Sequence, residues 1–219
     1  MKSLNKVRTI FFDYDGTLHD SIHIYAPAFQ KAYDYLVCNG YADKRKWSDK
    51  EISHWLGYNP TDMWRVFQPN LSDNIRQVCS EIIGEEMKHQ ILCGKPSLYE
   101  GSLDTLKYLQ KKDYQLVFIS NCKTYYMEYH RDLFQLNDYF EAMCCSEQFA
   151  YKPKYEILKS IKNDYKEQMV IVGDRIQDIE AGKKNNLITI GCRYGFGVPE
   201  ELKDADYLID DIRELGKLL

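Results

Sequence analysis

Three short apolar runs in this chain each end in a small group of polar residues. The runs cover residues 7–12, 116–119 and 169–172. Continuous apolar runs of this length are typical of parallel strands that are buried on both faces. The carboxyl ends of such strands meet at one edge of the sheet, so the polar residues that follow each run are expected to lie close together.

Helical patterns lie between these runs, so strands and helices alternate along the chain. Ser102 is expected to cap one helix, and Pro153 precedes another whose apolar residues recur at helical spacing. Apolar runs at 187–190 and 207–209 predict further strands. This alternation predicts an α/β fold, with a doubly wound parallel sheet in a Rossmann-like core.

A long insertion interrupts the alternation after Asp20. The interval up to Lys95 spans about 75 residues, far more than a connecting loop holds. Its apolar residues recur at spacings of three and four, and capping patterns predict helix starts near residues 22, 48, 60 and 72. We therefore expect an α-helical cap domain over residues 20–95, inserted into a catalytic core made of residues 1–19 and 96–219.

Composition excludes several classes of partner. The net charge is -4 and the basic residues are scattered, so nucleic acid is not expected and a small molecule is. The N-terminal segment 1–12 is too short for a signal sequence or a membrane span, so no membrane partner is expected. Seven cysteines without a Cys-x-x-Cys pair fit a reducing compartment, which predicts a cytoplasmic protein.

The first polar group contains Asp13 and Asp15, two residues apart where the first run ends. Side chains at this spacing leave an extended segment on the same side. Gly16 and Thr17 then permit a tight turn. A turn alone explains neither the second aspartate nor the apolar run before it, so we interpret the pair as functional.

The next two groups carry donors that suit an anion. Ser120 and Asn121 end the second run and supply a hydroxyl, an amide and backbone N–H groups at the start of a helix, where phosphate binds well. Lys152, before Pro153, supplies a positive charge, and Lys154 is the alternative lysine. These groups predict a phosphate site.

The last group contains Asp174, which follows the third run, and Asp178 four residues later. Asp178 lies at the opening of a helix, where it could also act as a cap. Together with Asp13 these carboxylates repel one another and need a cation. Their oxygen atoms are the ligands that Mg²⁺ prefers, so the sequence predicts a magnesium site.

In this order the groups resemble the haloacid dehalogenase superfamily, specifically its phosphatases with a helical cap after the first motif. Residues 11–20 are similar to the first motif of that family and residues 117–121 to the second. Residues 152–153 and 172–179 are similar to the third and fourth. The segment 99–101 resembles the phosphoglycolate phosphatase and β-phosphoglucomutase branch. The resemblance covers essentially the whole chain.

The resemblance implies a phosphatase that hydrolyses a small phosphorylated metabolite through an aspartyl phosphate. Asp13 would attack phosphorus, and Asp15 would act first as acid and then as base. The spacing alone does not say which aspartate attacks. The implied Mg²⁺ ligands are Asp13, the backbone carbonyl of Asp15, Asp174 and Asp178, and the implied phosphate ligands are Thr17, Ser120, Asn121 and Lys152.

Substrate choice is expected to depend on the cap. Tyr58 and Asn59, in the turn after the second cap helix, are the candidate contacts, and Arg65 could bind a second anionic group. His19 and Arg175 differ from the residues that are usual in the family. His19 is expected either to line the entrance or to pack inside the protein.

Two other functions share these motifs. A sugar-phosphate mutase of the β-phosphoglucomutase type differs only in its cap residues and in the slow hydrolysis of its phosphoenzyme. A catalytically silent binding protein on the same fold would be expected to have lost a motif residue, and none is lost here. A two-component receiver is excluded by Asp174 and by the long insertion.

Overall fold

The computed structural model describes residues 3–58, 60–166 and 168–219. The chain divides into two compact units, of which the first comprises Met1–Asp20 and Leu98–Leu219 and the second Ser21–Ser97. The second unit is therefore an insertion after the first strand. Its bounds lie close to those expected for the cap.

The first unit contains a six-stranded sheet whose strand order is β3-β2-β1-β4-β5-β6. All neighbouring strands are parallel. The central strand β1 pairs with β2 and β4, so that Phe12 lies opposite Phe118 on one side and Val172 on the other. The strands are β1 Thr9–Phe12, β2 Gln115–Ser120, β3 Ala142–Cys145, β4 Met169–Gly173, β5 Ile188–Cys192 and β6 Tyr207–Ile209.

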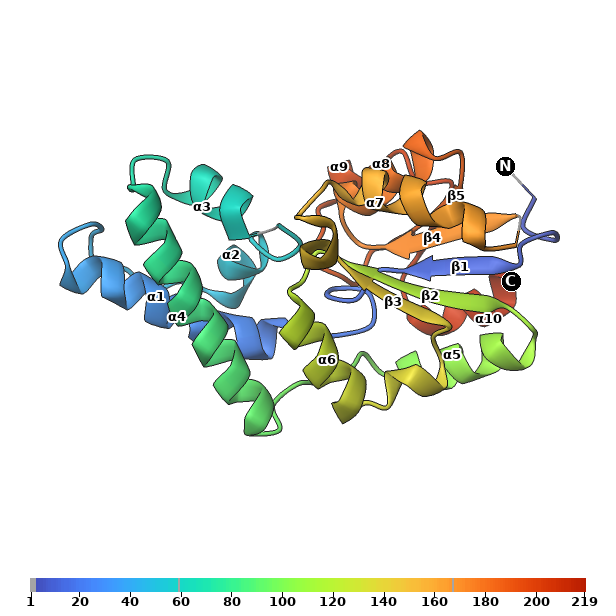
Figure 1. Ribbon diagram of the computed structural model, residues 1–219, viewed down its shortest axis with the longest axis horizontal. Coiled ribbons are helices and arrows are strands. Elements are labelled where there is room, and N and C mark those ends of the chain that lie inside the picture. Colours follow the sequence, from blue (N-terminus) through green and yellow to red (C-terminus); the bar gives the residue numbers. More distant parts are fainter. Residues whose placement is uncertain (1–2, 59, 167) are drawn as a thin grey trace. The chain divides into compact units, whose positions relative to one another are not determined.

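Helices cover both faces of this sheet, as Figure 1 shows: α7 and α8 lie on one face, and α5, α6 and α10 on the other. The helices are α5 Ser102–Lys111, α6 Thr124–Leu133, α7 Lys154–Ile161, α8 Ile176–Lys184, α9 Pro199–Leu202 and α10 Leu215–Leu218. Short 3-10 turns cover Leu136–Asp138, Ser146–Phe149, Lys162–Asp164 and Ile212–Glu214. The predicted doubly wound α/β fold is confirmed.

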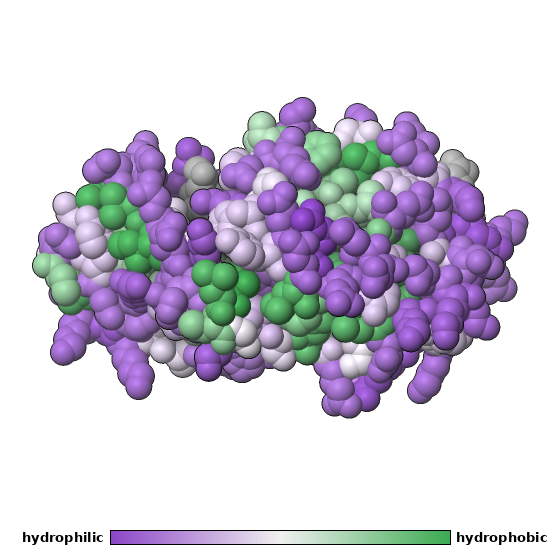
Figure 2. Space-filling view, turned by 60° about the horizontal axis from the view of Figure 1, so that its bottom comes forward, coloured by the Kyte–Doolittle hydropathy of each residue, from purple (hydrophilic) through white to green (hydrophobic). Residues whose placement is uncertain are grey.

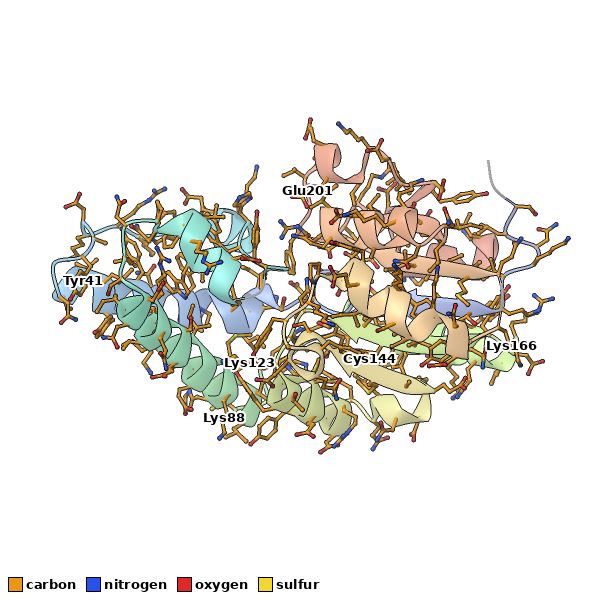
Figure 3. All side chains as sticks on the ribbon, turned by 45° about the horizontal axis from the view of Figure 1, so that its top comes forward. Tyr41, Lys88, Lys123, Cys144, Lys166 and Glu201 are labelled. Atoms are coloured by element: carbon orange, nitrogen blue, oxygen red, sulfur yellow. The ribbon has the colours of Figure 1, made fainter. Side chains whose placement is uncertain are left out.

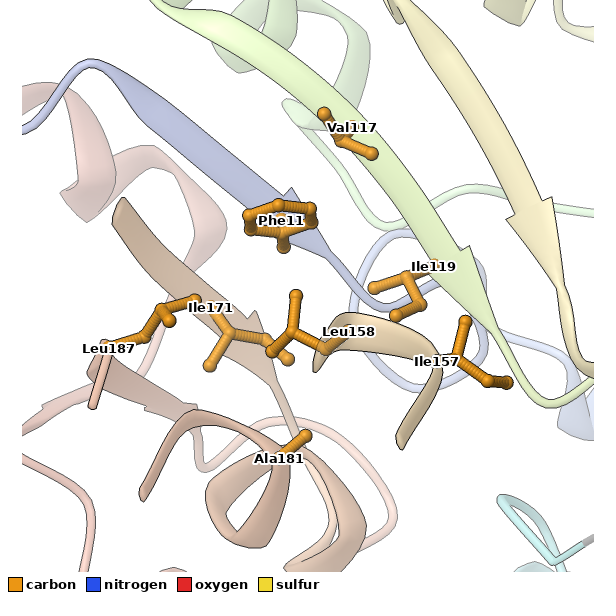
Figure 4. Packing of buried hydrophobic residues seen from close by; sticks show 8 residues of the cluster. All are labelled: Phe11, Val117, Ile119, Ile157, Leu158, Ile171, Ala181 and Leu187. Carbon is orange, nitrogen blue, oxygen red and sulfur yellow. The ribbon is translucent and has the colours of Figure 1, made fainter. Parts of the chain in front are cut away.

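The apolar runs are continuous because both faces of the sheet are buried. Phe11 of β1 faces α7 and α8 and packs in a cluster with side chains from these helices and the neighbouring strands (Figure 4). The other members of the cluster are Val117, Ile119, Ile157, Leu158, Ile171, Ala181 and Leu187. Ile10 and Phe12, which alternate with Phe11, are also fully buried. Full burial of a valine, leucine, isoleucine or phenylalanine side chain stabilises the fold by about 1.5–3 kcal/mol.

Two details of the first unit differ from the sequence-based expectation. Strand β3 was not predicted, because its sequence Ala-Met-Cys-Cys has no β-branched residue and it lies half-exposed at the sheet edge. Ser102 is the first residue of α5 and not its cap, since Gly101 occupies the cap position with φ +82°. The Ser102 hydroxyl instead donates to the carbonyl oxygen of Leu18 (3.1 Å).

The second unit contains the expected helices among its described residues. They are α1 Ile22–Cys38, α2 Asp49–Ser53, α3 Pro60–Phe67 and α4 Asp73–Leu92. Ser48 and Ser72 cap α2 and α4 as predicted, and Gly40 follows α1 with φ +74°. The rings of Phe29, Trp47 and Phe67 pack together inside this unit.

The exposed surface carries no large apolar face in the view of Figure 2, which shows hydrophilic side chains around small separate apolar patches. Exposed apolar residues such as Leu133, Ile176 and Leu208 come from different elements. Scattered exposed apolar residues of this kind are normal for a protein surface. Among the described residues, no helix has the length and apolar character needed to span a bilayer.

Gly182 allows α8 to approach the sheet, because a Cβ atom there would collide with the side chains of Thr189 and Ile171. We expect Gly182→Ala to lower the free energy of unfolding by about 1–3 kcal/mol through overpacking. Alanine's higher helix propensity, worth about 1 kcal/mol, offsets only part of this cost. Urea unfolding measures the change.

Gly216→Ala is the matched control, since the nearest atom to a Cβ there, Tyr108 Cε1, lies at 3.4 Å, an ordinary contact. This variant should be neutral or slightly more stable. Equal stabilisation in both variants would contradict the close approach of α8 to the sheet.

Candidate active site

Two neighbouring strands bring their aspartates to the centre of the sheet edge. Asp13 follows β1, and its backbone N–H donates to the carbonyl oxygen of Val172 in β4 (2.9 Å). Asp174 follows β4 directly. Since Phe12 and Val172 are in register, the residues just after them leave the sheet at the same edge.

A group of three buried carboxylates lies at this edge. One oxygen each of Asp13, Asp174 and Asp178 lies within 4.8 Å of the others. Asp174 Oδ2 accepts a hydrogen bond from the backbone N–H of Phe196 (2.6 Å), whereas its buried Oδ1 has no hydrogen-bond partner among the described residues. A buried carboxylate oxygen without a donor is suited to hold a cation.

The lysine that contacts these carboxylates is Lys154, which corrects the expectation of Lys152. Lys154 Nζ donates to Asp13 Oδ1 (2.7 Å) and to Asp178 Oδ1 (2.6 Å), and only 3% of its side chain is exposed. Lys152 is exposed. Pro153 occupies the N-cap position of α7, so Lys154 begins the helix while Lys152 lies in the exposed segment before it.

Burial and mutual repulsion dominate the electrostatics of this group. Burial and the nearby Asp178 raise the pKa of Asp13 to about 7, although Lys154 opposes the shift. Burial, Asp13 and Asp178 raise the pKa of Asp174 well above its usual value. Burial would lower the pKa of Lys154, but Asp13 and Asp178 outweigh it and raise that pKa.

The Lys154 ammonium group therefore contacts two of the three carboxylates, and a second positive charge would relieve the remaining repulsion. The three carboxylates, with an Asp174 Oδ1 that no described residue contacts by a hydrogen bond, fit a hard divalent cation such as Mg²⁺. Asp178 is less suited to bind this cation, because both of its oxygens already accept hydrogen bonds. Its Oδ1 accepts from Lys154, and its Oδ2 accepts from the backbone N–H of Arg175 (3.0 Å), where it caps α8.

Asp15 has different partners from Asp13. Its Oδ1 accepts a hydrogen bond from the Tyr126 hydroxyl (2.7 Å) and lies 2.9 Å from His19 Nδ1. Burial alone would raise the pKa of Asp15, but the contacts with His19 and Tyr126 hold it below its usual value. His19 is fully buried, so it packs inside the protein and does not line an entrance.

The expected anion donors lie around the same strand ends. Thr17 is fully buried, and its hydroxyl has no hydrogen-bond partner among the described residues. Ser120 is the last residue of β2, next to β1, and Asn121 follows it. Gly16 has φ +82°, and a Cβ atom there would collide with the carboxylate of Asp174.

A loop after β5 completes the site, and sequence reasoning missed it. Phe196 donates its N–H to Asp174, and the Tyr194 hydroxyl donates to the carbonyl oxygen of Thr17 (2.8 Å). A Cβ atom at Gly195 would collide with Asp174 and with the carbonyl oxygen of Gly16. The Gly-Phe-Gly sequence at 195–197 was the available signal, since paired glycines permit close backbone approach.

Residues 10–192 match the family model of haloacid dehalogenase-like hydrolases. The chain belongs to this family. It is 27% identical over 216 residues to pyrophosphatase PpaX of Bacillus pumilus, covering 95% of this chain and 94% of the relative. It is 26% identical over 218 residues to phosphoglycolate phosphatase of Aquifex aeolicus, covering 97% of each.

Solved structures have the same fold. A predicted phosphatase from Clostridium acetobutylicum matches with a TM-score of 0.83 at 23% identity, over 96% of this chain and 97% of that one. CbbY from Rhodobacter sphaeroides in complex with phosphate matches with a TM-score of 0.78 at 20% identity, over 96% of both chains. The expected family and hydrolase class are confirmed, and the names of the relatives support a phosphatase.

The sequence also singled out Arg175 and three residues of the helical unit. Arg175 is buried and donates to Glu201 of α9 (2.8 and 3.2 Å), which Figure 3 labels. In the helical unit, Tyr58 is half-buried near the rings of His54 and Trp55, and Arg65 is exposed. Asn59 lies outside the described residues. Substrate selection by the last three stays a prediction.

The contrast between the two lysines leads to a test. We expect Lys154→Met to lower kcat/KM for a chromogenic phosphomonoester by about 100-fold or more, because it removes the positive charge that contacts two buried carboxylates. Lys152→Met should change it less than about threefold, as is usual for an exposed side chain. Steady-state kinetics on variants with native circular dichroism spectra measure both effects. The reverse order would restore Lys152 as the site lysine.

Proposed function

We propose that this protein is a Mg²⁺-dependent phosphatase that hydrolyses a small phosphomonoester through an aspartyl phosphate on Asp13. The main support is that Asp13 and Asp15, only two residues apart, have separate sets of partners. Asp13 contacts Lys154 within the buried carboxylate group, whereas Asp15 contacts Tyr126 and His19. Two carboxylates in such different environments suit two different chemical roles.

Asp13 is the proposed nucleophile. A carboxylate oxygen of Asp13 forms a bond to phosphorus while the bond between phosphorus and the ester oxygen breaks. Asp15 gives a proton to the departing oxygen. It then accepts a proton from the water molecule that attacks the phosphoryl group, and the bond between Asp13 and phosphorus breaks to release inorganic phosphate.

The remaining residues stabilise charge. Asp13, the carbonyl of Asp15, Asp174 and Asp178 would hold Mg²⁺, which neutralises negative charge on the phosphoryl group when bound. Thr17, Ser120 and Asn121 would donate hydrogen bonds to the phosphoryl oxygens. Lys154 would hold Asp13 in position. In this proposal Asp174 binds the metal more directly than Asp178, whose two oxygens already accept other hydrogen bonds.

The substrate is proposed to be a small phosphorylated metabolite. Relatives named for phosphoglycolate support this class, and the relatives named pyrophosphatase PpaX favour pyrophosphate as a second candidate. We propose that Tyr58, Asn59 and Arg65 in the helical unit select among such anions, because an arginine and a tyrosine provide donors for a second anionic group.

Trapping the covalent intermediate tests this proposal. Asp15→Asn removes the proposed acid and base, but an ester with a good leaving group needs little protonation. Phosphorylation of Asp13 should therefore continue while its hydrolysis slows, so that intact-protein mass spectrometry detects one added phosphoryl group on Asp13. The double variant Asp13→Asn, Asp15→Asn is the control and should stay unmodified.

Two outcomes would change the proposal. A phosphoryl group that maps to Asp15 or Asp174 would overturn the assignment of the nucleophile. A long-lived phosphoenzyme in the wild-type protein that transfers its phosphoryl group to a sugar phosphate would favour the mutase.

A further inference from the structure

Four buried aromatic side chains form a hydrogen-bonded cluster next to Asp15. They are Tyr14, His19, Tyr126 and His130, called here the Asp15 cluster, and each is at most 3% exposed. Tyr14 and His19 belong to the loop after β1, whereas Tyr126 and His130 are four residues apart on one face of α6. Tyr14 and His19 lie within the first motif segment 11–20, whereas Tyr126 and His130 lie outside all four motif segments.

The cluster makes two contacts with one oxygen of Asp15. The Tyr126 hydroxyl lies 2.7 Å from Asp15 Oδ1, His19 Nδ1 lies 2.9 Å from the same oxygen, and the hydroxyl and Nδ1 are 3.1 Å apart. The Asp15 side chain is still 19% exposed. The carboxylate is therefore held from its buried side while part of it remains accessible.

A separate hydrogen bond joins the other two members of the cluster, Tyr14 and His130. The Tyr14 hydroxyl lies 2.6 Å from His130 Nδ1. Burial lowers the pKa of His130 to about 3, and the nearby His19 acts in the same direction, so His130 is neutral and forms this hydrogen bond as an uncharged ring. The Tyr14 ring stacks on His19 with an interplanar angle of 12°, and the Tyr126 ring packs on His130.

We propose that Tyr126 and His19 are positioning residues that orient the Asp15 carboxylate for proton transfer, and that the Tyr14–His130 pair holds their rings in place. This inference rests on the proposed function, in which Asp15 is the acid and base. The Tyr126 hydroxyl acts as a donor, because the oxygen that it contacts belongs to a carboxylate, which accepts hydrogen bonds. A carboxylate that rotates freely would spend less time in the reactive orientation.

Tyr126→Phe separates orientation from packing, because it removes one hydroxyl and keeps the ring. With 4-nitrophenyl phosphate and Mg²⁺, the burst of nitrophenol that accompanies phosphorylation of Asp13 should change less than about threefold, since this leaving group needs little protonation. Hydrolysis of the phosphoenzyme needs Asp15 as base and should slow by about 10- to 100-fold. Rapid-quench kinetics measure both steps.

Tyr129→Phe is the matched control. It is the same substitution on the same helix, and the Tyr129 ring contacts the ring of Tyr125. Both steps should keep their wild-type rates in this variant. Equal rates in Tyr126→Phe and Tyr129→Phe, or an equal loss in both steps of Tyr126→Phe, would overturn the positioning role.

A second pair of variants decides the question if Tyr126→Phe does not fold. His19→Asn keeps an N–H donor near the position of Nδ1, whereas His19→Leu removes it. Phosphoenzyme hydrolysis should be faster in His19→Asn than in His19→Leu, and equal rates would overturn the proposal. A wild-type protein that forms no phosphoenzyme would instead refute the proposed function, so the two failures are distinguishable.

Discussion

The main physical constraint on the site is the repulsion between three carboxylates that the fold buries together. The parallel pairing of β1 with β4 brings Asp13 and Asp174 to the same edge, and the first turn of α8 adds Asp178. Burying like charges is costly, so the surrounding chain must supply positive charge and hydrogen-bond donors. Lys154 supplies one positive charge, and Mg²⁺ is proposed to supply the rest.

Close approach of the backbone brings one of these hydrogen-bond donors to Asp174. Gly16 and Gly195 allow two loops to approach Asp174 so closely that a side chain at either position would collide with it. The second loop donates the N–H of Phe196 to one Asp174 oxygen, and the other has no partner in the part of the chain that the structure describes. The geometry thus orients Asp174 and keeps one oxygen available for a ligand.

The sequence predicted the parts of the fold that depend on short-range patterns. The strands around Asp13 and Asp174 were predictable because both faces are buried and their apolar runs are continuous. Strand β3 was not, because an exposed edge strand needs no such run. Lys152 and Lys154 flank the same proline, and only the start of α7 distinguishes them. Tyr126 contacts Asp15 across 111 residues of sequence, so no local pattern indicated it.

Dependence of turnover on Mg²⁺ tests the account most directly. Wild-type protein dialysed against a chelator should not hydrolyse a chromogenic phosphomonoester, and added MgCl₂ should restore turnover in a saturable way. Asp174→Asn should need a Mg²⁺ concentration at least about 10-fold higher, because it loses the negative charge of the carboxylate whose Oδ1 has no donor among the described residues, whereas Asp178→Asn should shift it less. Full turnover in the presence of chelator would contradict the account.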